Sequence, residues 1–181
     1  MDSGWILYGF CKDISERMMF GGTYTHSLDT AGRFVMPQVF RTSLGPEFYI
    51  TKGVGCLCVF TEEYARGVEE QLRSLGSPLE ILLNPDIARL HRHFFSDMVK
   101  TKTDSKNRTL LPPEHRKYSG IDTELTICGC GQYIELWSPE ALEAYRTDNE
   151  CTDKLILAGS ALLSNLKGSS DVGISSTGPS K

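Results

Sequence analysis

The sequence, 181 residues long, contains no apolar run approaching the roughly 18 residues that a membrane-spanning helix needs. The longest early candidate, residues 5–10, is preceded by Asp2 and by no positive residue, unlike a secretory signal. Only four histidines are present, and neither a nucleophile with its base and orienting residue nor a phosphate-binding loop is spelled out. We therefore expect a cytoplasmic protein that is not an enzyme, does not bind a membrane, and uses neither a cofactor nor a small-molecule substrate.

The six cysteines do not form the pattern of a small disulfide-stabilised scaffold. Cys56 with Cys58, and Cys128 with Cys130, have C-x-C spacing, which on a strand places both thiols on one face. A metal site needs about four converging ligands, whereas free cysteine usually packs as a small apolar residue. Buried packing is therefore favoured over metal or redox chemistry, and no metal site is predicted.

The strongest feature that is present is an internal repeat. The stretch DTAGRFVMPQVFR at residues 29–41 returns as DSKNRTLLPPEHR at residues 104–116. Four identities in this stretch exceed the roughly one expected from average residue usage. The similarity continues beyond the repeated stretch at a nearly constant offset, which is too long for a solenoid, so two pseudo-symmetric halves sharing one core are predicted. The identical pairs, all at the same separation, are Asp29 and Asp104, Arg33 and Arg108, Pro37 and Pro112, and Arg41 and Arg116.

Each unit is predicted to contain a tight turn between two short strands, then a short helix, two further strands and a last helix, which Thr61 would cap in the first unit and Ser138 in the second. Gly32 supplies a positive φ angle in the first turn, and Asn107, at the same place in the second, tolerates this conformation next best. Proline ends each short return strand, because it suits the first turn of a helix and not the inside of a sheet. A further helix is predicted around residues 87–95, and residues 153–167 are compatible with another. The predicted strands are residues 23–28, 34–36, 48–52 and 56–60, and residues 109–111, 124–128 and 132–137.

Charge is distributed unevenly along the chain. The net charge of −4, taken for the whole chain, argues mildly against a nucleic-acid partner. However, residues 100–117 contain six Lys or Arg against two acids, whereas residues 135–153 contain one Arg against six acids. Positive charge therefore collects at the second repeated turn, where it forms either a solvated basic surface or part of a nucleic-acid site.

The repeated Asp-x-x-x-Arg pair has two interpretations. As structure alone, each pair would fasten a hairpin by a salt bridge, and an exposed salt bridge contributes little to stability. Stability is therefore a weak reason for the same pair to occur twice. The functional interpretation is that each Asp fixes its turn and directs a planar guanidinium outward, toward phosphates or the edge of guanine, which arginine suits better than lysine.

These residues carry a family resemblance. The order D-x-x-x-R, two apolar residues, proline and a later arginine resembles the AbrB/SpoVT-type DNA-binding motif. Two copies in one chain, opened by M-F-x-G at residues 19–22, resemble the MraZ family of bacterial transcriptional regulators over about residues 19–146. The second copy departs from the family pattern at Asn107, Thr109 and His115.

The resemblance implies an α+β fold in which two pseudo-symmetric swapped-hairpin (SpoVT-AbrB-like) repeats form a shared β-barrel with peripheral helices. It also implies homo-oligomeric rings that bind double-stranded DNA, chiefly as a repressor, at repeated promoter boxes upstream of the division and cell-wall gene cluster. Such a protein would be cytoplasmic and associated with the nucleoid. The DNA-binding residues would be Asp29, Arg33, Asp104 and Arg108 from the repeated motif, with Lys102 and Lys106 from the basic segment.

The same resemblance suggests domain boundaries. Residues 19–80 form the first repeat with its helix. Residues 1–18 lie outside the resemblance and have no counterpart in the repeat, so they are an ordered extension, a disordered one, or untranslated if the true start is Met18 or Met19. Residues 81–146 contain a linker helix and the second repeat, and residues 147–181 form a C-terminal extension that is disordered from about residue 168. Two other functions stay open: an AbrB-like antitoxin, with a disordered toxin-binding segment, or an assembly scaffold that uses the same barrel without a promoter role.

Overall fold

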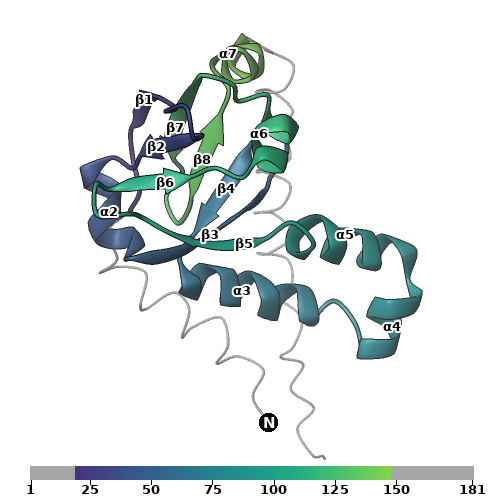
Figure 1. The fold of residues 1–181 in the computed structure, drawn as a ribbon. Coiled ribbons are helices and arrows are strands. Elements are labelled where there is room, and N and C mark those ends of the chain that lie inside the picture. Colours follow the sequence, from purple (N-terminus) through teal and green to yellow (C-terminus); the bar gives the residue numbers. More distant parts are fainter. Residues whose placement is uncertain (1–18, 148–181) are drawn as a thin grey trace, which may run out of the picture. The chain divides into compact units, whose positions relative to one another are not determined.

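The structure is a computed structural model, and it describes residues 19–147 (Figure 1). The chain divides into two compact units, residues 1–142 and residues 143–181, and the second is described only over residues 143–147. The expected extension at residues 1–18, the helix expected within residues 153–167, Cys11 and Cys151 lie outside the described residues. In chain order the elements are β1 Thr23–Ser27, β2 Arg33–Val35, α2 Gln38–Leu44, β3 Glu47–Lys52, β4 Leu57–Phe60, α3 Glu62–Arg73, α4 Pro78–Leu83, α5 Pro85–Phe95, β5 Val99–Lys102, β6 Arg108–Leu110, α6 Pro113–Ser119, β7 Glu124–Gly129, β8 Ile134–Trp137 and α7 Pro139–Thr147.

The two copies fold alike, which confirms the predicted repeat. β1, β2 and α2 of the first copy return in the same order as β5, β6 and α6 of the second, and β3, β4 and α3 return as β7, β8 and α7. The predicted strands agree with the structure to within two residues at each end. Helix α4 is an addition to the predicted elements, and Ser77 with Glu80 forms the capping box at its start.

Proline and glycine define the two short helices that follow the turns. Pro37 and Pro112 stand at the N-caps of α2 and α6, where a missing backbone N–H costs nothing. Gly45 and Gly120 end the same helices with φ angles of 78° and 67°, a conformation that suits glycine. These short helices separate each tight turn from the two strands that follow it.

The two repeats exchange strands and together form one antiparallel sheet. The order of the larger sheet is β1-β7-β8-β4-β3-β5, so β1 of the first repeat pairs with β7 of the second repeat, and β5 of the second repeat pairs with β3 of the first. If each strand is replaced by its equivalent in the other repeat, the same order results, read from the opposite edge of the sheet. The larger sheet is therefore pseudo-symmetric, and neither repeat has its full set of strand partners without the other repeat.

A separate two-stranded ribbon joins the two turns. β2 and β6 pair antiparallel, with Phe34 opposite Thr109 at the centre of the ladder. These two residues are equivalent positions of the repeat, so the pseudo-twofold axis passes between them. Both side chains are buried, and Phe34 packs in the main core with residues of the larger sheet. The ribbon thus has one face on the core and one face toward solvent.

A second apolar cluster contains the C-x-C cysteines. Cys56, Cys58 and Cys128 are buried, and Cys130 packs against the same cluster of aromatic and aliphatic residues. This confirms the prediction that these thiols pack in the interior. Burial is the main cause that raises the pKa of Cys130, to about 12, so the thiol form is favoured at neutral pH. In residues 19–147, no helix is both long enough and apolar enough to cross a membrane.

Candidate nucleic-acid interface

The first turn is built around the carboxylate of Asp29. Its Oδ1 accepts hydrogen bonds from the backbone N–H groups of Ala31 and Arg33, at 3.0 and 2.9 Å. Its Oδ2 accepts from the Arg33 guanidinium, through Nε at 2.9 Å and Nη2 at 2.8 Å. The carboxylate therefore closes the turn with one oxygen and fixes the direction of the arginine with the other.

The second turn repeats this geometry around Asp104. Oδ1 accepts from the backbone N–H groups of Lys106 and Arg108, at 2.8 and 2.9 Å. Oδ2 accepts from Arg108 Nε at 2.9 Å and from Nη2 at 2.7 Å. Asn107 adopts the expected positive φ angle, 61°, so replacing the glycine of the first copy leaves the turn unchanged. The departure at Asn107 therefore leaves the hydrogen bonds between Asp104 and Arg108 the same as those of the first turn.

Glycine is favoured at position 32 of the first turn for two reasons. Its φ angle is 76°, in the region that favours glycine. A Cβ atom built at this position would also lie 2.9 Å from Nη1 of Arg116, the arginine that follows the second turn. Arg116 donates to the backbone carbonyls of Ile121 and Asp122, which holds it in place beside the first turn. The first turn is thus supported by the opposite half of the chain.

Hydrogen bonding lowers the pKa of both carboxylates below the ordinary value for aspartate. The pKa of Asp29 is lowered, chiefly by the hydrogen bond from the backbone N–H of Arg33. The pKa of Asp104 is lowered to about 2, chiefly by the side-chain hydrogen bonds from Arg108. Both groups are therefore negatively charged at neutral pH, as the orientation of the two guanidinium groups requires.

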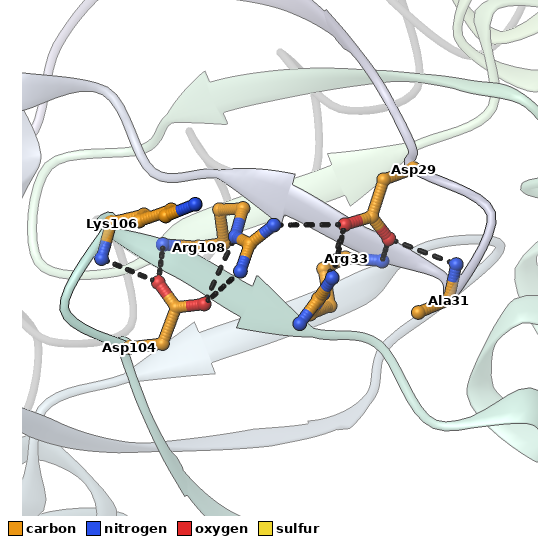
Figure 2. A network of polar contacts seen from close by, with 6 residues as sticks. All are labelled: Asp29, Ala31, Arg33, Asp104, Lys106 and Arg108. Atoms are coloured by element: carbon orange, nitrogen blue, oxygen red, sulfur yellow. Dashed lines mark hydrogen bonds and ion pairs between the residues drawn. The ribbon is translucent and has the colours of Figure 1, made fainter.

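One contact distinguishes the two arginines. Nη1 of Arg108 reaches across the pseudo-twofold axis and lies 3.4 Å from Oδ2 of Asp29, so Arg108 is held between both aspartates (Figure 2). Arg33 bonds to Asp29 alone within residues 19–147, which leaves its Nη1 and the outer N–H of Nη2 available. The Arg33 side chain is also the more exposed, at 35% against 26% for Arg108.

The strand register gathers four side chains on the outer face of the ribbon. Arg33 stands opposite Leu110, and Val35 stands opposite Arg108. Directly opposed residues of an antiparallel pair share a face, as do residues two apart on one strand. Val35 and Leu110 are 41% and 49% exposed. The motif identified the two arginines but not these two aliphatic residues, because each lies in a short apolar run that does not show which face is exposed.

Lysine residues accompany the second turn and not the first. Lys102 ends β5 just before the turn and Lys106 lies within it, and both are exposed. The equivalent positions of the first copy hold Ser27 and Ala31. Lys100, which contributes to the same basic segment, instead forms ion pairs with the carboxylates of two acidic residues, Glu47 at 3.0 Å and Glu62 at 3.4 Å.

The six predicted site residues therefore fall into two groups. Asp29, Arg33, Asp104 and Arg108 form one network on the ribbon, although the two motifs lie in opposite halves of the sequence. Lys102 and Lys106 flank the second turn of that network. Over the part of the chain that the structure describes, no group of three or more His, Cys, Asp or Glu side chains is arranged to hold a metal ion.

Comparison with known proteins gives one consistent family. The family model described as "MraZ protein", with an antitoxin likeness in its description, matches residues 19–76 and 94–154. A protein of Acetivibrio thermocellus named "Transcriptional regulator MraZ" is 32% identical over 146 residues, which is 80% of this chain and 99% of the relative. Relatives of the same name from Carboxydothermus hydrogenoformans and Clostridium tetani are each 36% identical, over 70% and 72% of this chain and 86% and 89% of their own length.

Proposed function

Because this chain belongs to the MraZ family, we propose that it is a sequence-specific DNA-binding transcriptional regulator whose reading element is the β2–β6 ribbon. The relatives are named as transcriptional regulators. The observation that carries the proposal is the ribbon face itself, on which Arg33 and Arg108 are each directed by an ionised aspartate. The major groove of B-form DNA is about 12 Å wide and admits a two-stranded ribbon.

The proposed roles follow from the chemistry of each side chain. An arginine fork donates two parallel hydrogen bonds to O6 and N7 of guanine, which makes Arg33 and Arg108 the base-reading residues. Asp29 and Asp104 orient the forks and do not touch DNA themselves, since a carboxylate near phosphates would be repelled. Lys102 and Lys106 contact phosphates, which adds affinity without sequence preference.

The strand exchange supports a finer description of the fold. We infer that the two repeats form one swapped-hairpin barrel, because β1 and β5 each pair with a strand of the opposite repeat. The corresponding boundaries are residues 19–80 for the first repeat with its helix and residues 81–146 for the linker helix and second repeat, with extensions at residues 1–18 and 147–181. The barrel would present both turns at one end.

An exposed leucine surface supports assembly of several chains. Leu79, Leu82 and Leu83 of α4 are 63 to 73% exposed, and several exposed large apolar residues on one short helix are typical of an interaction site. We propose that this surface contributes to a homo-oligomeric ring. In a ring, ribbons on neighbouring subunits would bind repeated promoter boxes together, and avidity would raise the affinity without new contacts in any one subunit. The regulator would act in the cytoplasm, at the nucleoid, chiefly as a repressor of the division and cell-wall gene cluster.

A gel-shift experiment tests the proposed function. The full chain is titrated onto a duplex from immediately upstream of its own coding sequence, and onto an unrelated duplex of equal length and base composition. The proposal predicts a shift of the upstream duplex at protein concentrations that leave the unrelated duplex free. Equal affinity for the two duplexes, at physiological salt, would contradict sequence-specific binding.

A further inference from the structure

Val35 and Leu110 are the two large aliphatic side chains that the ribbon exposes to solvent. Single exposed aliphatic residues are common on protein surfaces, so the exposure of 41% and 49% is not informative alone. Their location is informative, because the register places both on the face that carries Arg33 and Arg108. The buried side chains of Phe34 and Thr109 point the other way, so turning either aliphatic residue inward would require a change of register.

The dimensions of the ribbon relate these side chains to the spacing of bases. Residues two apart on a strand are about 7 Å apart, and directly opposed side chains have Cβ atoms about 5 Å apart. Successive phosphates on one DNA strand are about 3.4 Å apart along the helix axis. If an arginine of the ribbon contacts a guanine, the aliphatic residues on the same face therefore lie over bases about one or two steps away.

The major groove offers one apolar group to such a side chain. This group is the C5 methyl of thymine, and apolar contact with it is a recognised means of reading a thymine. We propose that Val35 and Leu110 are specificity-determining residues that contact thymine methyl groups beside the guanines read by the arginines. This inference rests on the DNA-binding function proposed above, and it names the second kind of base that the ribbon recognises.

The ribbon would then read two chemical features at once. Arg33 and Arg108 supply hydrogen-bond donors to the acceptor edge of guanine, and the aliphatic pair supplies apolar surface to thymine. Serine at either aliphatic position would keep the strand but remove the apolar surface. The serine variants should therefore lose binding affinity only for DNA that carries thymine methyl groups, and not for DNA without them.

The test compares thymine with deoxyuridine, which differs only by the absence of the C5 methyl. The upstream duplex of the chain's own coding sequence is made in both forms, as is an unrelated duplex, and the affinity of each is measured by fluorescence anisotropy. The proteins are the wild type, Val35→Ser, Leu110→Ser, the double variant, and Val54→Ser as a matched control. Val54 is an 89% exposed aliphatic residue in the loop between β3 and β4.

The wild type should bind the thymine form of its upstream duplex more tightly, by about fourfold for each contacted methyl group. The double variant should bind both forms equally, with the affinity that the wild type has for the uridine form, and each single variant should lose part of the preference. Val54→Ser should behave as the wild type, and the unrelated duplex reports any effect of uridine on DNA shape.

Two outcomes would overturn the inference while leaving the proposed function intact. The wild type could prefer its upstream duplex over the unrelated one but bind its thymine and uridine forms equally. Alternatively, folded Ser variants could keep the wild-type thymine preference. A wild type that does not distinguish upstream from unrelated DNA would instead refute the proposed function, and this inference with it. The single variants keep the test decisive if the double variant fails to fold.

Discussion

Replacing Arg33 by alanine should remove base reading while leaving the fold intact. Two N–H groups of the Arg33 side chain bond to Asp29, and the remaining donors on Nη1 and Nη2 form an outward fork. Loss of a bidentate contact to guanine costs about 1 to 3 kcal/mol of discrimination, or about 5- to 150-fold in affinity for each engaged site. Because its side chain is partly exposed and its ion pair lies at the surface, we expect a fall in melting temperature of only about 4 °C or less.

The assay is a pair of titrations by fluorescence anisotropy, one with the upstream duplex and one with an unrelated duplex. Arg33→Lys keeps the positive charge but not the planar fork, so it should retain general DNA binding and lose preference for the upstream duplex. Arg73→Ala removes the same charge from α3, where the side chain is 73% exposed, and should change neither titration. A folded Arg33→Ala protein with wild-type preference would refute the reasoning, because Arg33 would then only fasten its turn.

Three further predictions concern stability and assembly. The Thr109 hydroxyl is buried at the pseudo-twofold axis without a hydrogen-bond partner in the described residues, so Thr109→Val should raise the free energy of unfolding in urea by about 1 kcal/mol or more. Because Arg108 lowers the pKa of Asp104 to about 2, the ionised carboxylate should contribute stability in full above pH 3.8 and lose it as the pH falls through about 2. Asp104→Asn should therefore flatten the acid limb of a melting-temperature profile. Leu82→Ser should lower the mass measured by light scattering if α4 joins subunits, and an unchanged mass would exclude this residue from the interface.

Much of the fold was open to prediction from the repeat. Gly32 and Asn107 mark turns because few residues adopt their backbone conformation, and the prolines and glycines around the short helices mark helix ends in the same way. These signals depend only on residues close together in the chain, so they can be recognised in a single sequence. Because the repeat occurs twice, the elements predicted in one copy could be compared with those predicted in the other.

Strand partners were less accessible, because a strand pattern states which face is buried but not which neighbour supplies the hydrogen bonds. The pairing of β1 with β7 joins the first strand of the first repeat to a strand of the second repeat that is far away in the sequence. The same limit applies to Lys100, which the charge pattern grouped with Lys102 and Lys106. Folding brings Glu47 and Glu62 to its ammonium group, and neither acid is near it in the sequence.

The candidate site was predictable in its polar part and not in its apolar part. The Asp and Arg residues stand out because the same spacing occurs twice, and the structure joins them in one network. Val35 and Leu110 resemble ordinary strand residues in the sequence. Only the ladder between β2 and β6 shows that they share the outer face with the two arginines.

The most direct test of the ribbon as the DNA-binding surface is photo-crosslinking from a diazirine analogue of leucine. The analogue is placed at Leu110 on the ribbon or at Leu82 on α4, since both side chains are exposed leucines and the chemistry is matched. With the upstream duplex bound, we predict a crosslink to DNA from position 110 and none from position 82. Crosslinks from position 82 with none from position 110 would contradict the assignment of DNA binding to the ribbon.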